Sequence, residues 1–101
     1  MIPAFEVVDI TTPKQFAPVV VDGRALVWFR TGTTLYLENI EPSTRESALI
    51  VLRIEAYRRQ LQEIGPTWTC RLHLQGSQLE RLHSVTHLYI EESDVATRAT
   101  S

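Results

Sequence analysis

Residues 19–40 read VVVDGRALVWFRTGTTLYLENI, and the fold depends on how this apolar stretch is arranged. A membrane-spanning helix needs about twenty apolar residues with few or no charges. Here four charged residues and two glycines interrupt the run. β-Branched and aromatic residues dominate it, and these residues favour strands over a helix. The stretch therefore predicts strands joined by turns, and no membrane anchor.

Two dipeptides predict where those turns lie. Asp22-Gly23 is typical of a two-residue hairpin loop, because both residue types tolerate positive φ. Thr31-Gly32 is a weaker signal of the same kind. We therefore expect a three-stranded antiparallel meander, with strands at about 16–21, 24–30 and 33–40. One more strand is expected over 5–10, at an edge of the sheet.

The next segment has the periodicity of a helix. A capping box is predicted at Ser43-Thr-Arg-Glu46, and Gly65-Pro66 would end the helix. Between them, apolar residues recur at spacings of 4, 3, 4 and 3, at Ile50, Ile54, Tyr57, Leu61 and Ile64. This spacing places them on one helical face. We expect one long amphipathic helix over about 43–64, packed on the sheet.

The C-terminal part predicts two further strands. Residues 68–75 alternate between apolar and polar, which is typical of a half-buried strand. Residues 79–85 fit either a short helical turn or part of a long strand, and a final strand follows. The order β-βββ-α-β-(α)-β indicates an α+β fold with an antiparallel sheet. We expect a single domain over 1–92 and a frayed polar tail over 93–101.

Composition limits the functional class. The 101 residues suit one domain, and the net charge of −2 argues against nucleic acid as a partner. Nine arginines accompany a single lysine, a bias that suits protein contacts. Cys70 is the only cysteine, which indicates a reducing cytoplasm. The first residues lack a basic region, so no signal peptide is expected.

One constellation has the residue types of a zinc site. Cys70 and His73 are three residues apart, and His83 and His87 follow four residues apart. Residues i and i+3 of a strand point to opposite faces, so Cys70 and His73 would not share an ion. We expect no metal and no cofactor, and Cys70 to be an inert core thiol. His83 and His87 remain open between ordinary surface residues and a pH-responsive patch near 91–92.

The predicted helix carries more apolar surface than one packed face needs. Ala48, Val51 and Leu52 lie opposite its main stripe, with Arg53 and Arg59 as flanking polar contacts. We therefore expect a cytoplasmic, non-catalytic protein–protein interaction domain, regulatory or for assembly, that forms a homodimer or binds another protein. In this interpretation Leu52→Arg abolishes association and leaves the circular dichroism spectrum intact.

The alternative hypothesis is a small-molecule-binding or enzymatic domain. Its site would lie between sheet and helix, near Trp28, Tyr36, Tyr57 and His73. The sequence contains no phosphate-binding loop, nucleophile elbow or zinc-protease motif. No catalytic residue is therefore predicted, and the sequence favours a non-catalytic role over an enzyme.

Overall fold

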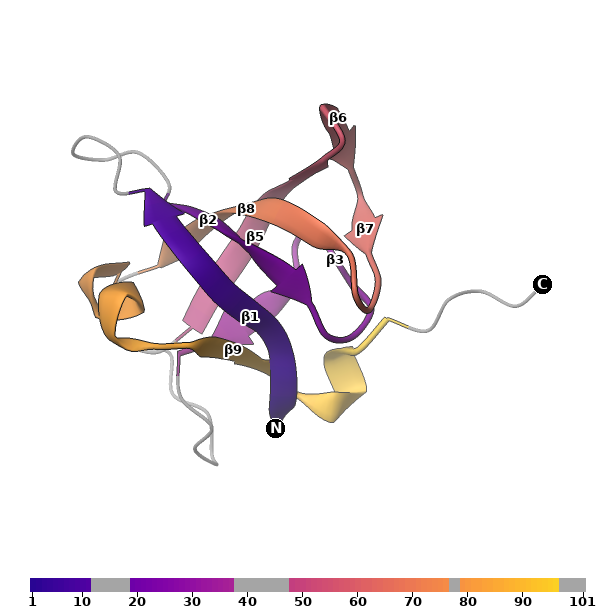
Figure 1. The fold of residues 1–101 in the computed structure, drawn as a ribbon. Coiled ribbons are helices and arrows are strands. Elements are labelled where there is room, and N and C mark those ends of the chain that lie inside the picture. The colour runs from indigo at the N-terminus through magenta and orange to yellow at the C-terminus, as the bar shows by residue number, and fades with distance from the viewer. Residues whose placement is uncertain (12–18, 38–47, 77–78, 97–101) are drawn as a thin grey trace.

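A computed structural model describes residues 1–11, 19–37, 48–76 and 79–96. Within these ranges the chain forms β-strands and short 3₁₀ turns (Figure 1). The strands are β1 (Ile2–Thr11), β2 (Val19–Ala25), β3 (Phe29–Arg30), β4 (Thr34–Tyr36), β5 (Ala48–Ala56), β6 (Arg59–Leu61), β7 (Glu63–Ile64), β8 (Thr69–Gly76) and β9 (His87–Ile90). The 3₁₀ turns are η2 (Leu79–Ser84) and η3 (Glu92–Asp94).

The main sheet closes on itself. Its strands are hydrogen-bonded in the order β4-β9-β1-β2-β8-β5, and a β4–β5 pairing joins the two ends. All these pairings are antiparallel. Beyond the point where β4 ends, β5 continues and pairs with β6, while β3 and β7 form a separate two-stranded sheet. We call the ring of six strands the closed sheet; its core lies inside.

Buried apolar residues alternate with outward-facing residues along the strands, and the buried side chains form the core. In β8, Cys70, Leu72 and Leu74 are buried, while the residues between them face outward. Phe5 is fully buried and meets Phe29 edge-on, with ring centroids 6.5 Å apart. Such edge-to-face pairs stabilise a core beyond the area they bury. None of the helical turns in the described ranges is long and apolar enough to cross a membrane.

The predicted α+β fold is wrong, because the expected helix over 43–64 is absent where the structure describes it. Residues 48–64 form β5, β6 and β7, and the predicted capping box lies outside the described residues. The error has a physical cause in β5. Its register shifts between Val51 and Arg53, so the buried residues are Leu49, Val51, Ile54 and Ala56. A bulge inserts one residue and breaks the period of two, so β5 lacks the strict alternation that indicates a strand. The apolar stripe that predicted the helix does not share one face, because Ile50 and Tyr57 are exposed whereas Ile54 and Ile64 are buried.

The turn after β5 also lacked a sequence signal. Tyr57 and Arg58 connect β5 to β6 with φ of 54° and 63°, respectively, and Ala56 pairs with Arg59. This is a two-residue hairpin loop with both central residues left-handed. Because such loops normally contain Asn or Gly, sequence patterns do not predict one at Tyr57-Arg58.

The predicted meander is also wrong. Asp22 and Gly23 lie within β2, which pairs with β1 and β8. Gly23 is needed there for close packing, since an added Cβ would overlap the Glu6 carbonyl and the Phe5 ring. The turn at Thr31-Gly32 is present, with Gly32 at φ 87°. The strands on its two sides pair with other strands, however, and not with each other.

Other strand predictions fare better. The strand predicted over 68–75 corresponds to β8, and the helical turn and final strand correspond to η2 and β9. The strand predicted over 5–10 lies inside β1 but is not at an edge, because β1 has β2 on one side and β9 on the other. Local alternation thus identified β8, which alternates without interruption, and most of β1, although its register with β2 shifts between Val7 and Asp9.

Candidate functional site

The outer face of β1, β2, β5 and β8 carries charges that neutralise one another. The Arg71 Nε donates to Asp22 Oδ1 at 2.8 Å, and Arg24 lies 3.6 Å from Glu6. Glu55 Oε1 lies 2.6 Å from His73 Nε2 and 3.7 Å from Arg53 Nη1. The hydrogen bond to Asp22 raises the pKa of Arg71. We call this set (Glu6, Asp22, Arg24, Arg53, Glu55, Arg71 and His73) the charged wall.

Aromatic side chains are exposed at one end of the molecule. Tyr57 is 75% exposed and Trp68 is 46% exposed, and their rings meet edge-on with centroids 5.5 Å apart. Beside Trp68 lies a hollow of about 210 Å³ lined by Trp28, Leu61, Glu63, Ile64, Gly65 and Trp68. We call this hollow, together with the neighbouring hairpin residues Tyr57, Arg58 and Arg59, the aromatic corner. Large exposed aromatic residues that cluster in this way mark interaction surfaces more often than scattered ones do.

The backbone around the aromatic corner is strained. Tyr57, Arg58 and Thr67 have φ of 54°, 63° and 74°, and within the described ranges they are the non-glycine residues with positive φ. Side chains with a Cβ rarely adopt this conformation, which costs about 1–2 kcal/mol per residue. Tyr57 and Arg58 form the hairpin loop, and Thr67 precedes Trp68. Backbone strain of this kind concentrates at functional sites.

The segment that carries Trp68 is held firmly despite its exposure. The Trp68 amide donates to the Gly65 carbonyl at 3.3 Å, and the Trp68 carbonyl accepts from the Ala25 amide at 2.9 Å. The Thr67 amide donates to the Ala25 carbonyl at 2.9 Å. At Gly65, an added Cβ would overlap the Trp28 indole, so glycine allows the two to pack closely. The hollow is therefore preformed, which lowers the entropic cost of binding.

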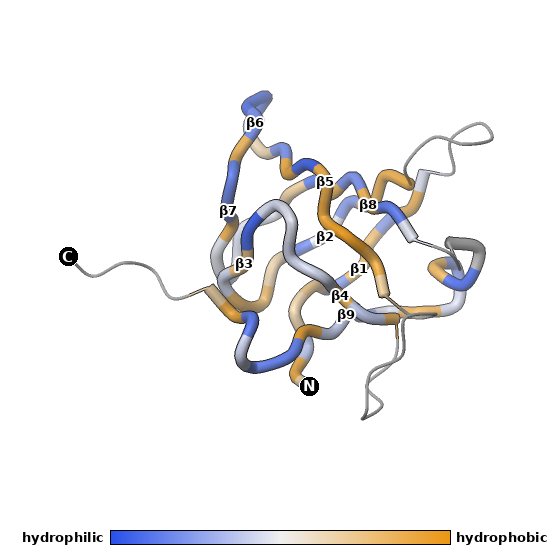
Figure 2. Tube along the Cα trace, turned by 180° about the vertical axis from the view of Figure 1, so that it is seen from behind, coloured by the Kyte–Doolittle hydropathy of each residue, from blue (hydrophilic) through white to orange (hydrophobic). Residues whose placement is uncertain are grey.

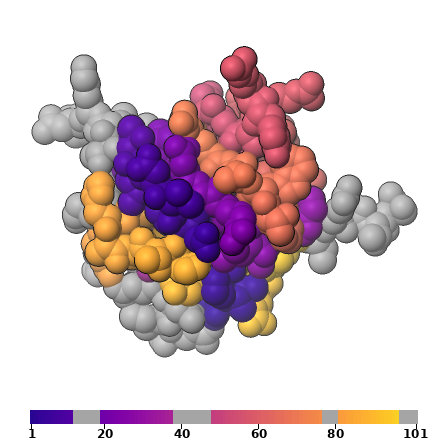
Figure 3. All heavy atoms as spheres, viewed as in Figure 1, coloured from indigo at the N-terminus to yellow at the C-terminus, as the bar shows by residue number. Residues whose placement is uncertain are grey.

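Two arginines project from the hairpin beside these rings. Arg58 and Arg59 are exposed, and neither is paired with a carboxylate in the part of the chain that the structure describes. The hairpin and its long side chains extend beyond the body of the molecule (Figure 3). Seen from behind in Figure 2, the tip at β6 is hydrophilic, whereas the first half of β5 is hydrophobic.

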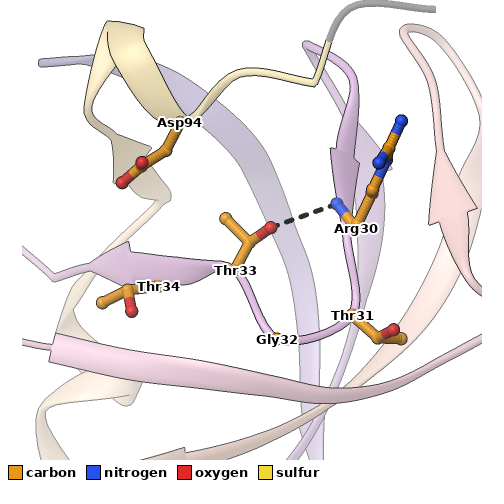
Figure 4. A pocket seen from close by; sticks show the side chains of 6 residues that line it. All are labelled: Arg30, Thr31, Gly32, Thr33, Thr34 and Asp94. Atoms are coloured by element: carbon orange, nitrogen blue, oxygen red, sulfur yellow. Dashed lines mark hydrogen bonds between the residues drawn. The ribbon is translucent and has the colours of Figure 1, made fainter.

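A second hollow lies at the β3–β4 turn. It measures about 370 Å³ and is lined by Arg30, Thr31, Gly32, Thr33, Thr34 and Asp94. The side chains of Arg30, Thr31 and Asp94 point in different directions rather than toward one point (Figure 4). The Thr33 hydroxyl already accepts from the Arg30 amide at 3.2 Å, and Arg30 lies 3.5 Å from Glu63. This hollow lacks the convergent polar groups of a ligand site.

The predicted helix-face residues lie on strands instead. Val51 is fully buried and Ala48 is half-buried, whereas Leu52 is 42% exposed at the bulge of β5. Arg53 belongs to the charged wall, and Arg59 lies at the hairpin. These five residues therefore do not form a single outer face. Leu52 and its neighbour Ile50, which is 44% exposed, remain as a small apolar surface on β5.

The residues predicted to line a ligand pocket also separate into groups. Trp28 and Tyr57 both lie next to Trp68, at the aromatic corner. Tyr36 pairs with Tyr89 across β4 and β9, and His73 belongs to the charged wall. Because the predicted helix is absent, no site lies between sheet and helix. Trp68 itself was assigned to a half-buried strand; the preceding Gly65-Pro66 turn was the signal that it lies at an exposed strand end.

Among the described residues, the groups suited to catalysis or metal binding lie apart from one another. Cys70 points into the core, and burial, followed by the nearby Asp22 charge, raises the pKa of its thiol to about 12. His73 faces outward from the same strand, as the sequence predicted. His87 lies 4.0 Å from Glu6, measured from Nε2 to Oε2. In the described ranges, no three His, Cys, Asp or Glu side chains are grouped to hold a metal ion.

The chain matches no protein-family model, no curated protein and no solved structure. Its class is defined by its own topology, as a small closed antiparallel sheet with an exposed aromatic corner. Function is therefore inferred from the site alone.

Proposed function

We propose that this chain is a non-catalytic interaction module that binds a partner protein through the aromatic corner. The observation that carries the proposal is the exposure of Tyr57 and Trp68 on strained but hydrogen-bonded turns. The exposed rings keep apolar surface in contact with water, which is unfavourable in free energy. The left-handed backbone at the neighbouring residues adds conformational strain. A binding partner that covers the rings would recover part of that free energy.

The size of the hollow favours a protein side chain over a whole metabolite. At about 210 Å³, it is smaller than the 300–1,000 Å³ that is typical of small-molecule sites. Protein interfaces, by contrast, are centred on single anchor residues in small pockets. Tryptophan, tyrosine and arginine are the residues enriched at such centres. All three types occur at the aromatic corner, in Tyr57, Arg58, Arg59 and Trp68.

A selection with random peptides tests this proposal. A phage-displayed heptapeptide library is panned against the wild-type chain, and the enriched sequences are then tested against Trp68→Ala and Tyr57→Gly. We expect enriched peptides whose binding depends on both residues. Tyr57→Gly is a useful variant because glycine accepts the φ of 54° and the fold keeps its stability. A selection that yields no peptide dependent on Trp68 would contradict the proposal.

A second copy of the chain is one partner that this module could bind. The test is the absolute mass by light scattering on a size-exclusion column, over a tenfold concentration range. We propose that any dimer forms through the aromatic corner and dissociates in Tyr57→Gly. The exposed pair Ile50 and Leu52 is the competing surface. A dimer that Leu52→Arg disrupts and Tyr57→Gly leaves intact would place the interface on β5 instead.

A further inference from the structure

We infer that the segment bound at the aromatic corner is acidic, with carboxylates beside one aromatic or large apolar anchor residue. This inference rests on the proposed function and names the chemistry of the partner. The anchor would enter the hollow beside Trp68, and the carboxylates would meet Arg58 and Arg59. Arginine suits this contact because its planar guanidinium binds a carboxylate through two parallel hydrogen bonds.

The distribution of ion pairs supports an acidic partner. Arg24, Arg30, Arg53 and Arg71 each have a carboxylate of this chain within 4 Å. Arg58 and Arg59 are exposed and have no such carboxylate among the described residues. The chain as a whole is negative, at −2, so positive charge at Arg58 and Arg59 is a local departure from the net charge. Opposite local charge guides association and selects between partners.

Glu63 does not reverse the sign of this surface. Among the described residues it is the one charged residue that lines the hollow, and its carboxylate lies 3.5 Å from Arg30 Nε. Its charge is thus already compensated within the chain. The charges left for a partner at the aromatic corner are those of Arg58 and Arg59. A basic ligand would meet two like charges there, and an acidic ligand would meet two opposite ones.

Single-stranded nucleic acid is the other polymer that combines flat rings with negative charge. Such strands are bound by aromatic platforms along an extended positive groove. Two arginines on a chain of net charge −2 are few for phosphate binding, whose affinity depends on the number of cations. The small hollow also fits one side chain better than a series of bases. These observations favour the acidic peptide, and the nucleic acid becomes an outcome of the test.

Intrinsic fluorescence can report the binding directly. Trp28 and Trp68 are the only tryptophans of the chain, and both line the hollow. The first probe is the blocked peptide Asp-Glu-Phe-Glu-Asp, which contains no tryptophan. Two matched probes replace its phenylalanine with alanine or its four acids with lysine. We expect a saturable change in emission with the first probe, and binding about tenfold or more weaker for the other two.

A charge-swapped variant tests the role of the arginines. Arg58→Glu/Arg59→Glu should weaken the acidic phenylalanine peptide about tenfold or more and strengthen the lysine peptide. Arg24→Glu/Arg71→Glu makes the same change in net charge on the charged wall and should leave both affinities nearly unchanged. Circular dichroism and thermal melting of each variant check that the fold is retained. Raising the salt to 1 M should reduce the difference between the acidic and basic peptides.

Each remaining outcome decides the matter. Phenylalanine peptides that bind equally with acidic or basic flanks would overturn the acidic partner and leave the proposed function standing. No change in emission with any of the three peptides would overturn the acidic partner, and the proposed function falls as well if the library selection yields no peptide that depends on Trp68. Oligothymidylate that binds more tightly than the acidic peptide, and depends on Arg58 and Arg59, would replace the peptide with a nucleic acid.

Discussion

The charged wall and the aromatic corner are two exposed regions that differ in whether their side chains are paired within the chain. On the charged wall, each cation lies near a carboxylate of the same chain, as for Arg71 and Asp22 at 2.8 Å. At the aromatic corner, Tyr57 and Trp68 are exposed, and Arg58 and Arg59 are left without a carboxylate among the described residues. Both regions are connected to the same strand, β5, so the difference does not come from the fold alone.

The difference shows which of the two surfaces is stable in solvent without a binding partner. A neutralised surface of short ion pairs is compatible with solvent on its own. The left-handed residues beside the exposed rings, Tyr57, Arg58 and Thr67, lower the stability of the free chain by about 1–2 kcal/mol each. For a small domain with about 5–15 kcal/mol of total stability, this cost is appreciable. The proposed binding role at the aromatic corner would account for this cost.

The largest expected effect compares two aromatic residues. Phe5→Ala should lower the free energy of unfolding by about 3–5 kcal/mol, because Phe5 is fully buried against Phe29 and Gly23. Trp68→Ala removes a larger ring but should cost only about 1 kcal/mol, because the ring is 46% exposed. Urea unfolding followed by circular dichroism measures both.

The contrast between these two variants is the informative quantity. A Trp68→Ala variant as unstable as Phe5→Ala would mean that Trp68 supports the core and that the aromatic corner is a packing feature. In that case the peptide selection would lose its main control, and Tyr57→Gly would have to replace it.

Much of the strand content was predictable from local patterns. β8 alternates without interruption, so its buried residues Cys70, Leu72 and Leu74 were identified. β5 was not predictable, because its bulge at Leu52 breaks the alternation of buried and exposed residues. The helical spacing that was followed instead joins exposed residues, such as Ile50, to buried ones, such as Ile54. The meander failed for a different reason. Asp22-Gly23 has the sequence of a turn, but Gly23 is required by packing against Phe5 and not by a turn.

The second prediction concerns the strained hairpin loop. Replacing Tyr57 and Arg58 by Asn and Gly gives the loop the residues that its φ values of 54° and 63° favour. Tyr57→Asn/Arg58→Gly should raise the free energy of unfolding by about 1–2 kcal/mol, because the strain is relieved. The same variant should lose peptide binding, since it removes one ring and one guanidinium. Thermal melting and the fluorescence titration measure the two effects.

A stability that falls in this variant would mean that the edge-on contact of Tyr57 with Trp68 outweighs the backbone strain. Arg58→Gly alone separates the two contributions, because it relieves strain at one residue and keeps the ring contact. If Arg58→Gly raises the free energy of unfolding and Tyr57→Asn does not lower it, backbone strain remains the larger contribution at this loop.

The site was predicted only in part, for reasons that lie in tertiary structure. Trp28 and Tyr57 were predicted for a pocket between sheet and helix, and Arg59 for the outer face of the helix. The fold places all three at or beside the aromatic corner instead. Their common neighbour Trp68 was missed, because alternation alone assigned it to the same face as Cys70. Arg53 and His73 were assigned to separate sites, yet they share Glu55. Pairing between β5 and β8 creates that contact.

The third prediction uses the buried thiol as a reporter of the closed sheet. Burial, followed by the Asp22 charge, raises the pKa of Cys70 from 9.0 to about 12. The unfolded thiol therefore ionises at a lower pH than the folded one. The stabilisation is complete below pH 9 and is lost as the pH rises toward 12. Between pH 9 and 10, the wild type should lose about 1 kcal/mol more than Cys70→Ala in urea unfolding. Equal losses would indicate that the thiol is accessible to solvent.

The smallest expected effect returns to the charged wall. Asp22→Asn removes the carboxylate that accepts from Arg71 at 2.8 Å and 3.3 Å. Exposed ion pairs contribute about 0.2–1 kcal/mol, so the loss should be below 1 kcal/mol and should shrink further in 1 M salt. Thermal melting at low and high salt measures it, with Glu63→Gln as the matched change beside the aromatic corner. A loss above 2 kcal/mol would make the ion pairs of the charged wall a main source of stability. In that case, mutual neutralisation of charges would no longer mark a surface without a function. A loss within the expected range would keep the charged wall as the passive surface, and Arg58 and Arg59 at the hairpin as the charges available to the proposed partner.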